Sequence, residues 1–202
     1  MSANSSTSTR ERSALLLASS IKRSLGSGEL SDVQFTIGLQ FGQPKYFRAH
    51  NSVFCAMFYG KLAERSDHDI DIPDIIPDAF DNMLSFLYTD NVDNLDMDNV
   101  IQTLMCADKY DLPLLVDICC DFIRAQLCVD NCLALLNNAV GLRADVIVEP
   151  CLDFIDRNAD AVLLSERFAA VDQKTVVMIL RRDTLSAAEN NVYLAVEKYC
   201  TF

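Results

Sequence analysis

Reactive side chains are few in this sequence, and none has the spacing of a known catalytic or metal-binding motif. The chain has eight cysteines but only two histidines, His50 and His68. It contains no C-x-x-C pair, no Gly-rich phosphate loop and neither an H-E-x-x-H nor a G-x-S-x-G motif. A Cys-His nucleophile pair or a tetrahedral zinc site needs such groups to converge. We therefore predict a protein without catalytic residues, cofactor or bound metal.

Two groups of polar residues allow both a chemical and a structural interpretation. Asp69, Asp71 and Asp74 alternate along the sequence DIDIPD, which could suggest metal ligation. The glycine and the terminal glutamate of a calcium loop are missing, so a solvated strand edge is favoured. His50 lies between two expected buried positions and has no nucleophile near it in the pattern. A hydrogen-bonded core histidine is therefore favoured over a catalytic one.

The composition indicates a globular protein located in a reducing compartment. Half of the 202 residues are apolar, which is enough for one large or two small domains. The cysteines fall inside apolar helical runs, which is typical of free buried thiols rather than disulfides. A net charge of -12 disfavours a nucleic-acid partner. No run has the length of a membrane span or a signal peptide, so we expect a cytoplasmic protein, with the nucleus as the second possibility.

The first part of the chain predicts a small sheet followed by helices. Residues 1–11 are small and polar and are expected to be disordered. A short amphipathic helix follows, which could pack either on another subunit or on its own core. Alternating apolar residues predict a hairpin of strands 32–38 and 46–50 with its turn at 42–45, and a third strand near 70–73. Helices are expected at 53–63, 77–90, 98–110 and 114–127, so this part is an α+β domain.

The second part, residues 128–202, is expected to be an all-helical array. Asp130 is predicted to cap a helix that Gly141 ends, and Ser186-x-x-Glu189 is predicted to be a capping box before the last helix. Further helices are expected at 146–155, 160–164 and 173–180. Since the last helix runs to within two residues of Phe202, we expect a chain that is cut inside a larger protein.

Several successive motifs carry a family resemblance. Phe47-Arg48-Ala49-His50, Phe86-Leu87-Tyr88-Thr89 and Ala107-Asp108-Lys109-Tyr110 occur in this order, and Ser165-Glu166-Arg167-Phe168 and Arg182-Asp183-Thr184-Leu185 follow in the second part. The first part resembles a BTB/POZ domain (12–127), and the second resembles an incomplete BACK domain (128–202). The segments MFYGKLAE and RRDTLSAAENNVYLAVEKYC are most similar to the BTB-BACK-PHR subfamily, whose β-sandwich would lie beyond residue 202.

The resemblance implies a non-catalytic adaptor of a cullin-3 ubiquitin ligase that dimerises through its BTB domain. The residues implied at the cullin contact are Tyr59, Leu62, Glu64 and Tyr88. The residues implied at the dimer interface are Leu15, Leu16, Ile21, Leu25, Asp32 and Arg48. The helix pair from 130 to 155 would extend the cullin contact, and an unidentified substrate protein would bind a C-terminal domain absent from this chain. The alternative is a BTB assembly module in transcriptional repression or in cytoskeletal or neuronal organisation, without cullin binding.

One departure from the family pattern lies between His50 and Met57. The family has about seven more residues here, close to two helical turns. Loss of that helix would expose apolar area on the sheet and remove part of the usual dimer surface. We therefore expect either a repacked domain or a variant that folds poorly.

Overall fold

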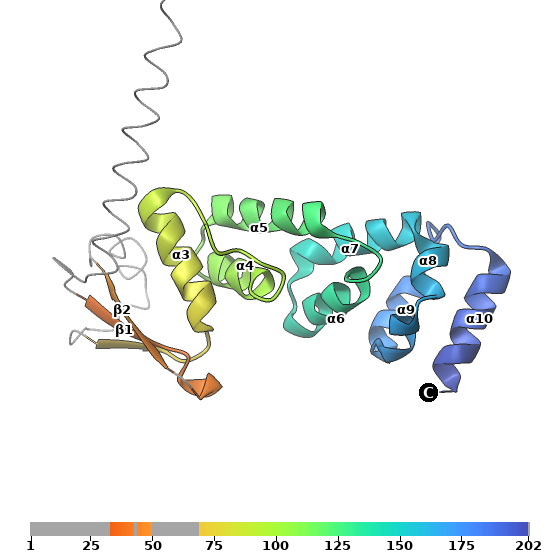
Figure 1. The fold of residues 1–202 in the computed structure, drawn as a ribbon, viewed down its shortest axis with the longest axis horizontal. Coiled ribbons are helices and arrows are strands. Elements are labelled where there is room, and N and C mark those ends of the chain that lie inside the picture. Colours follow the sequence, from red (N-terminus) through yellow and green to blue (C-terminus); the bar gives the residue numbers. More distant parts are fainter. Residues whose placement is uncertain (1–32, 43, 50–68, 202) are drawn as a thin grey trace, which may run out of the picture. The chain divides into compact units, whose positions relative to one another are not determined.

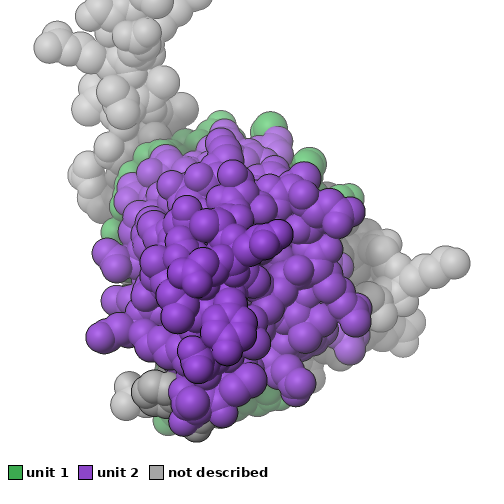
Figure 2. All heavy atoms as spheres, turned by 90° about the vertical axis from the view of Figure 1, so that its right-hand side faces the viewer, with its two compact units in different colours: residues 1–116 green, residues 117–202 purple. Residues whose placement is uncertain are grey.

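The computed structural model describes residues 33–42, 44–49 and 69–201, whose elements are labelled in Figure 1. The chain divides into two compact units, residues 1–116 and 117–202, which are coloured separately in Figure 2. The division falls inside the helix α5 (Pro113–Gln126). A small mixed sheet with helices in the first unit and helices alone in the second confirm the predicted α+β class followed by an all-α array.

The sheet of the first unit forms as its alternating sequence predicts. Strands β1 (Val33–Ile37), β2 (Lys45–Ala49) and β3 (Asp69–Ile72) lie in the order β2-β1-β3. The β1–β2 pair is antiparallel and places Phe35 opposite Phe47, whereas β3 runs parallel to β1. Every second residue of β1 is buried, beginning at Val33. One face of this strand therefore belongs to the core.

The hairpin turn is longer than predicted, and two glycines account for its path. The chain leaves β1 at Gly38, passes through the 3-10 turn η1 (Leu39–Phe41) and returns at Gly42. Both glycines have φ near +80°, a region that side chains with a Cβ rarely adopt. At Gly38 a Cβ would also lie only 3.0 Å from the ring of Pro77. Gly38 therefore allows the start of the next helix to pack closely against the sheet.

The helices α3 (Pro77–Thr89) and α4 (Val100–Lys109) complete the described core of the first unit. Pro77 is the first residue of α3, where its missing N–H is not needed. Phe80 on this helix is fully buried, and its ring centroid lies 5.3 Å from that of Phe35 and 5.2 Å from that of Phe47. This aromatic cluster joins the helix layer to the two hairpin strands.

The second unit consists of short helices around an aliphatic core. After α5 come α6 (Cys132–Leu142), α7 (Asp145–Arg157), α8 (Ala159–Leu163), the 3-10 helix η2 (Glu166–Ala170), α9 (Gln173–Leu180) and α10 (Glu189–Cys200). Helices α6 and α7 pack on each other, and α10 packs on η2 and α8. Phe168 is buried, and its ring meets that of Tyr199 edge-on at 6.3 Å. The range 173–180 agrees with the prediction.

Three predicted helix ends are wrong. The N-cap of α6 is Asn131 rather than Asp130, and its side-chain oxygen accepts the N–H of Cys128 at 2.8 Å. Gly141 lies inside α6, which ends because Arg143 adopts a left-handed φ of 59°. Ser186 is not the N-cap of α10, because the helix begins after Ala188 without a side-chain cap hydrogen bond.

An acceptor from α8 replaces the predicted capping box of α10. The Asp160 carboxylate accepts the Ala188 N–H at 3.0 Å and the Asn191 amide at 2.9 Å. A distant side chain thus satisfies the helix start that Ser186 was expected to cap. These two hydrogen bonds also lower the pKa of Asp160.

Candidate protein-binding surface

The residues predicted to bind cullin or form the dimer lie mostly outside the described parts of the chain. Tyr88 and Arg48 are described. The others, which lie outside the described residues, are Leu15, Leu16, Ile21, Leu25, Asp32, Tyr59, Leu62 and Glu64. The same holds for His50, for the disordered segment predicted at 1–11 and for the helix predicted at 53–63. Both residue sets therefore stay predictions, as do the domain boundaries given above.

Tyr88 lies in the last turn of α3 and is half-buried. The helix stops just beyond it because Asp90 adopts a left-handed φ of 54° and donates its N–H to the Phe86 carbonyl at 2.8 Å. The Thr89 hydroxyl donates to the Ser85 carbonyl at 2.6 Å. Tyr88 therefore belongs to a helix end whose backbone is fixed on both sides of it.

A buried polar network holds the middle of α3 against the start of α4. The Asn82 amide donates to the Asn99 side-chain oxygen at 3.3 Å and to the Thr103 hydroxyl at 3.1 Å, and all three residues are buried. The Asp96 carboxylate accepts the N–H groups of Asp98 and Asn99 at 2.9 Å, which satisfies donors before the first turn of α4. Because buried amides without partners are costly, the network fixes the α3–α4 connection.

Arg48 lies on the exposed side of β2. Its Nε donates to the Gln34 side-chain oxygen at 3.5 Å, and the two residues are directly opposite in the β1–β2 register. The predicted charged partner, Asp32, is outside the described residues. Among the described residues, the side-chain contact of Arg48 is thus a weak one to a neutral side chain.

The α4–α5 junction carries an exposed apolar residue next to an ion pair. The Lys109 ammonium lies 2.6 Å from the Asp74 carboxylate and 5.7 Å from the ring centre of Tyr110. The hydrogen bond from Lys109 lowers the pKa of Asp74, and burial raises the pKa of Tyr110. Leu114, at the start of α5, is 68% exposed. This junction therefore has both an ion pair and an exposed leucine on the described surface.

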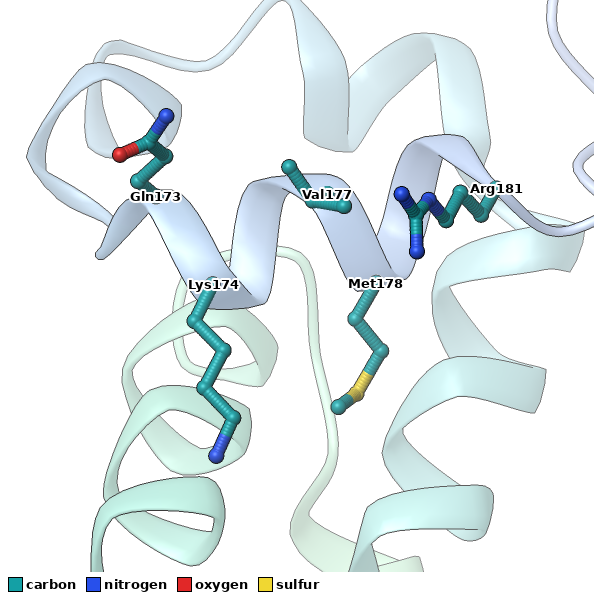
Figure 3. A pocket seen from close by; sticks show the side chains of 5 residues that line it. All are labelled: Gln173, Lys174, Val177, Met178 and Arg181. Carbon is teal, nitrogen blue, oxygen red and sulfur yellow. The ribbon is translucent and has the colours of Figure 1, made fainter.

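A groove lies along α9 in the second unit (Figure 3) and has a volume of about 580 Å³. We call it the α9 groove. Its lining residues are Gln173, Lys174, Val177, Met178 and Arg181. Sequence reasoning predicted the helix but missed the groove, although the two cations seven residues apart on the helix were visible in the sequence.

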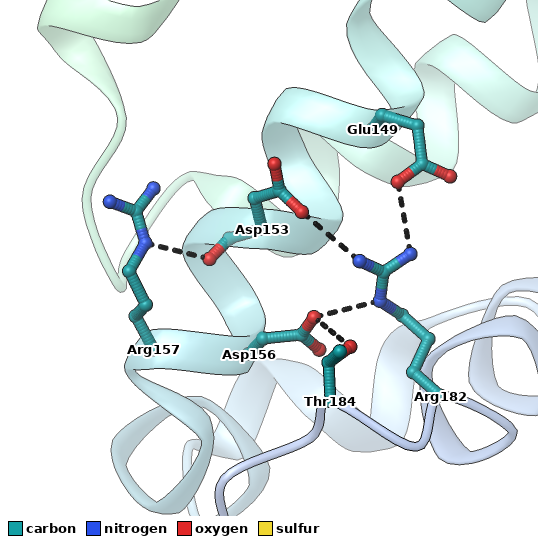
Figure 4. Close-up of polar contacts among 6 residues, drawn as sticks. All are labelled: Glu149, Asp153, Asp156, Arg157, Arg182 and Thr184. Atoms are coloured by element: carbon teal, nitrogen blue, oxygen red, sulfur yellow. Dashed lines mark hydrogen bonds and ion pairs between the residues drawn. The ribbon is translucent and has the colours of Figure 1, made fainter.

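An ion-pair cluster joins α7 to the segment after α9 (Figure 4). Arg182 donates from Nε to Asp156 at 2.8 Å, from Nη1 to Glu149 at 3.0 Å and from Nη2 to Asp153 at 3.1 Å. The Thr184 hydroxyl donates to the same Asp156 oxygen at 2.6 Å. Sequence reasoning missed this cluster, whose signal is three acids on one face of α7 at the spacing i, i+4, i+7. The cluster fixes the segment after α9 to α7.

The cysteines in the described residues form no disulfide with one another, and most are buried. Burial raises the pKa of Cys119 and of Cys151 to about 12 and that of Cys132 to about 11. These thiols stay protonated near neutral pH and are poor nucleophiles. Cys128 and Cys200 are exposed, contrary to the expectation that all the cysteines are buried.

Among the described residues, no group of three or more side chains is arranged to hold a metal ion. In the same part of the chain, every helix is too short or too polar to cross a membrane. The largest group of charged side chains there is the Arg182 cluster, in which one guanidinium contacts three carboxylates.

Comparisons with known proteins agree with the two-part organisation. The family model for the BTB/POZ domain matches residues 21–127, and the model described as "BTB And C-terminal Kelch" (BACK) matches residues 132–202. The chain is 38% identical to human BTB/POZ domain-containing protein 3 over 192 residues, which covers 92% of this chain and 35% of that protein. It is 36% identical to BTB/POZ domain-containing protein 6-A of Danio rerio over 194 residues, covering 93% and 34% respectively. The chain thus spans about a third of the length of the curated relatives it matches.

Proposed function

Because this chain belongs to the BTB/POZ family and its BTB/POZ domain is followed by a BACK domain, we propose that it is a substrate adaptor of a cullin-3 ubiquitin ligase. Domains of these two kinds mediate protein–protein interactions, and proteins that combine them are typically non-catalytic adaptors. The observation that carries the proposal is the order of the two matches, which together extend from residue 21 to residue 202.

The cullin contact in this proposal centres on Leu62, Glu64 and Tyr88. A leucine side chain can fill an apolar pocket on the partner, while a glutamate two residues later accepts hydrogen bonds at the rim. Tyr88 adds an aromatic ring with a polar tip, which is a common anchor at interfaces. Its place at the fixed end of α3 supports this role, since a rigid anchor loses little entropy on binding.

The helix pair α6–α7 supplies a second contact in this proposal. The two helices pack on each other, and Leu142 and Val146 are exposed where α6 ends and α7 begins. Two apolar residues four positions apart suit a small apolar patch on the partner. In the first unit, the resemblance implies that Tyr59 flanks the contact formed by Leu62 and Glu64.

Dimerisation is a separate part of the proposal. In the dimer interface, Arg48 would lie beside Asp32, and the exposed position of Arg48 on β2 supports this pairing. The substrate protein would bind a further domain, since the matched region is only about a third of the length of the relatives. We place the protein in the cytoplasm, with the nucleus as the second compartment, because its described thiols are free.

Binding to purified cullin-3 by biolayer interferometry tests the adaptor role. The wild-type chain is compared with Leu62→Ala/Glu64→Ala and with Tyr88→Ala. Tyr193→Ala is the control, because Tyr193 is 65% exposed on α10, a helix that supplies no residue to the proposed contact. We expect the double variant to bind at least about tenfold more weakly and the control to bind as the wild type does.

Two outcomes would contradict the proposal. If the wild-type chain does not bind cullin-3 but is dimeric, the assembly-module alternative holds. If the double variant binds as tightly as the wild type, the predicted contact residues are wrong. Dimerisation is checked by light scattering at roughly tens of micromolar, where a monomeric mass would refute it.

A further inference from the structure

The α9 groove occupies one face of its helix. Gln173 and Val177 are one turn apart, as are Lys174 and Met178, and Arg181 follows one turn after Val177. The opposite face carries the buried residues of α9, namely Thr175, Val176 and Ile179. The helix is therefore held by its inner face while the groove face stays open to solvent.

The cations of the groove have no acidic partner among the described residues. Lys174 and Arg181 are exposed, and neither forms a hydrogen bond or an ion pair there through its side chain. No carboxylate lines the groove. The next residue, Arg182, is surrounded by three carboxylates instead. In a chain with a net charge of -12, two unpaired cations on one helix face are a local exception.

The floor between the two cations is apolar. Val177 is 37% exposed, and Met178 is half-buried beside it. Figure 3 shows the Lys174 and Met178 side chains extending from the same side of α9. Methionine adapts its shape to different apolar partners. The volume of about 580 Å³ lies within the range of sites that hold a small group of side chains.

We propose that the α9 groove binds an acidic peptide segment of a partner protein, in which an apolar residue lies between two carboxylates. Lys174 and Arg181 are seven residues apart, about 10 Å along the helix axis. A helical segment matches this distance with acids at i and i+7. Side chains of an extended segment alternate between two faces, so its acids would be at i and i+4, about 13 Å apart on one face and within reach of the two long cationic side chains. The apolar residue would lie on Val177 and Met178, and Arg181 can bind a carboxylate through two parallel hydrogen bonds.

Charge favours an acidic peptide over a nucleic acid as the occupant. A polyphosphate chain needs a continuous basic track, whereas Asp172 and Asp183 lie in the sequence just before and just after the groove residues. The groove therefore offers two separate cations with an acid beyond each end. A short segment with two carboxylates fits this pattern. Its binding would not involve the residues of the cullin contact proposed above.

Selection from a phage-displayed random peptide library on the immobilised full-length chain tests the proposal. We expect the selected sequences to carry two acids at one of the two spacings with an apolar residue between them. A fluorescein-labelled selected peptide is then titrated with the wild-type chain and with Lys174→Glu/Arg181→Glu by fluorescence polarisation. The variant should bind at least about tenfold more weakly, and wild-type binding should weaken as salt rises.

The matched control is Arg143→Glu/Arg167→Glu, which makes the same change in net charge at two exposed arginines of the same unit that do not line the groove. This control should bind the peptide as the wild type does. The proposal is overturned if the selected peptides lack the acidic pattern, or if both double variants weaken binding equally. It is also overturned if a single-stranded oligonucleotide competes for the groove better than the selected peptide does.

Discussion

Replacing Arg182 by alanine should destabilise the second unit strongly, although this residue is near the surface. Its guanidinium is the shared partner of three carboxylates, and its side chain is only 19% exposed. Asp156 is more deeply buried, with 8% of its side chain exposed. Its second oxygen, Oδ1, has no hydrogen-bond partner among the described residues. Without Arg182, the Asp156 charge would keep only the Thr184 hydroxyl.

The magnitude follows from treating the three ion pairs separately. Glu149 and Asp153 are more than half exposed, so their pairs contribute less than about 1 kcal/mol each. Removing one partner of a buried pair costs about 3–5 kcal/mol, because an uncompensated charge stays behind. The Thr184 hydrogen bond and the partial exposure of Arg182 place the expected loss near the lower end, at about 3 kcal/mol.

Native-state hydrogen exchange of the full chain, read on peptides from α7 and α9 across a urea series, measures this loss in the second unit alone. A signal averaged over both units would not, since the chain has two compact units. Arg181→Ala is the control, because its side chain lies in the α9 groove without an ion pair among the described residues. It should change stability by no more than about 0.5 kcal/mol.

A second substitution separates the charge effect from lost packing. Asp156→Asn removes the buried charge, so in the Arg182→Ala background it should recover about 1 kcal/mol or more. The reasoning is refuted if Arg182→Ala stays within about 0.5 kcal/mol of the wild type. It is equally refuted if Asp156→Asn makes the variant still less stable, because packing alone would then explain the loss.

Three further outcomes are expected from the described residues. Phe80→Ala should destabilise the first unit by about 3–5 kcal/mol, since it removes a fully buried ring; exchange of α3 peptides measures this, and a loss below about 1 kcal/mol would contradict the packing. The pKa of Cys119 and of Cys151 is raised in the folded chain from 9.0 to about 12. The free energy of unfolding should therefore not depend on these thiols below pH 9 and should fall as the pH rises from 9 towards 12, because they ionise first in the unfolded chain. Melting temperatures at different pH should show this fall, and Cys151→Ala should make it less steep. Lys109→Met should cost less than about 1 kcal/mol by urea unfolding because the ion pair with Asp74 is exposed, and an equal cost in 1 M salt would show that packing and not charge is responsible.

Local patterns predicted most of the described elements. The alternation that begins at Val33 predicted β1, and Pro77 marked the start of α3 because its fixed φ suits a first helical position. One of the helix limits missed by the sequence, the start of α10, depends on a contact between distant residues. Asp160 accepts the Ala188 N–H where Ser186 was expected to supply the cap, and nothing in the sequence near residue 186 indicates that acceptor.

The candidate site was predictable only in part, for the same reason. The helical spacing of apolar residues placed Tyr88 near the end of a helix, and the structure places it in the last turn of α3. The α9 groove and the Arg182 cluster depend on which helix faces are covered by neighbours, which periodicity alone cannot specify. The family match gives the order of the two domains. Which cations are paired, as Arg182 is, and which are not, as in the α9 groove, depends on how the helices pack.

The parallel pairing of β1 with β3 sets an order of events during synthesis on the ribosome. The β1–β2 hairpin joins neighbouring segments and can close within microseconds once residue 49 is free. The partner on the other side of β1 is complete only at Ile72, after the whole intervening segment has been made. Until then, that side of β1 has backbone groups without their final partners, a state prone to pairing with other chains. Slower translation during the interval in which residues 50–72 emerge from the ribosome should therefore lower the soluble yield of the protein, whereas slower translation after β3 has emerged should not.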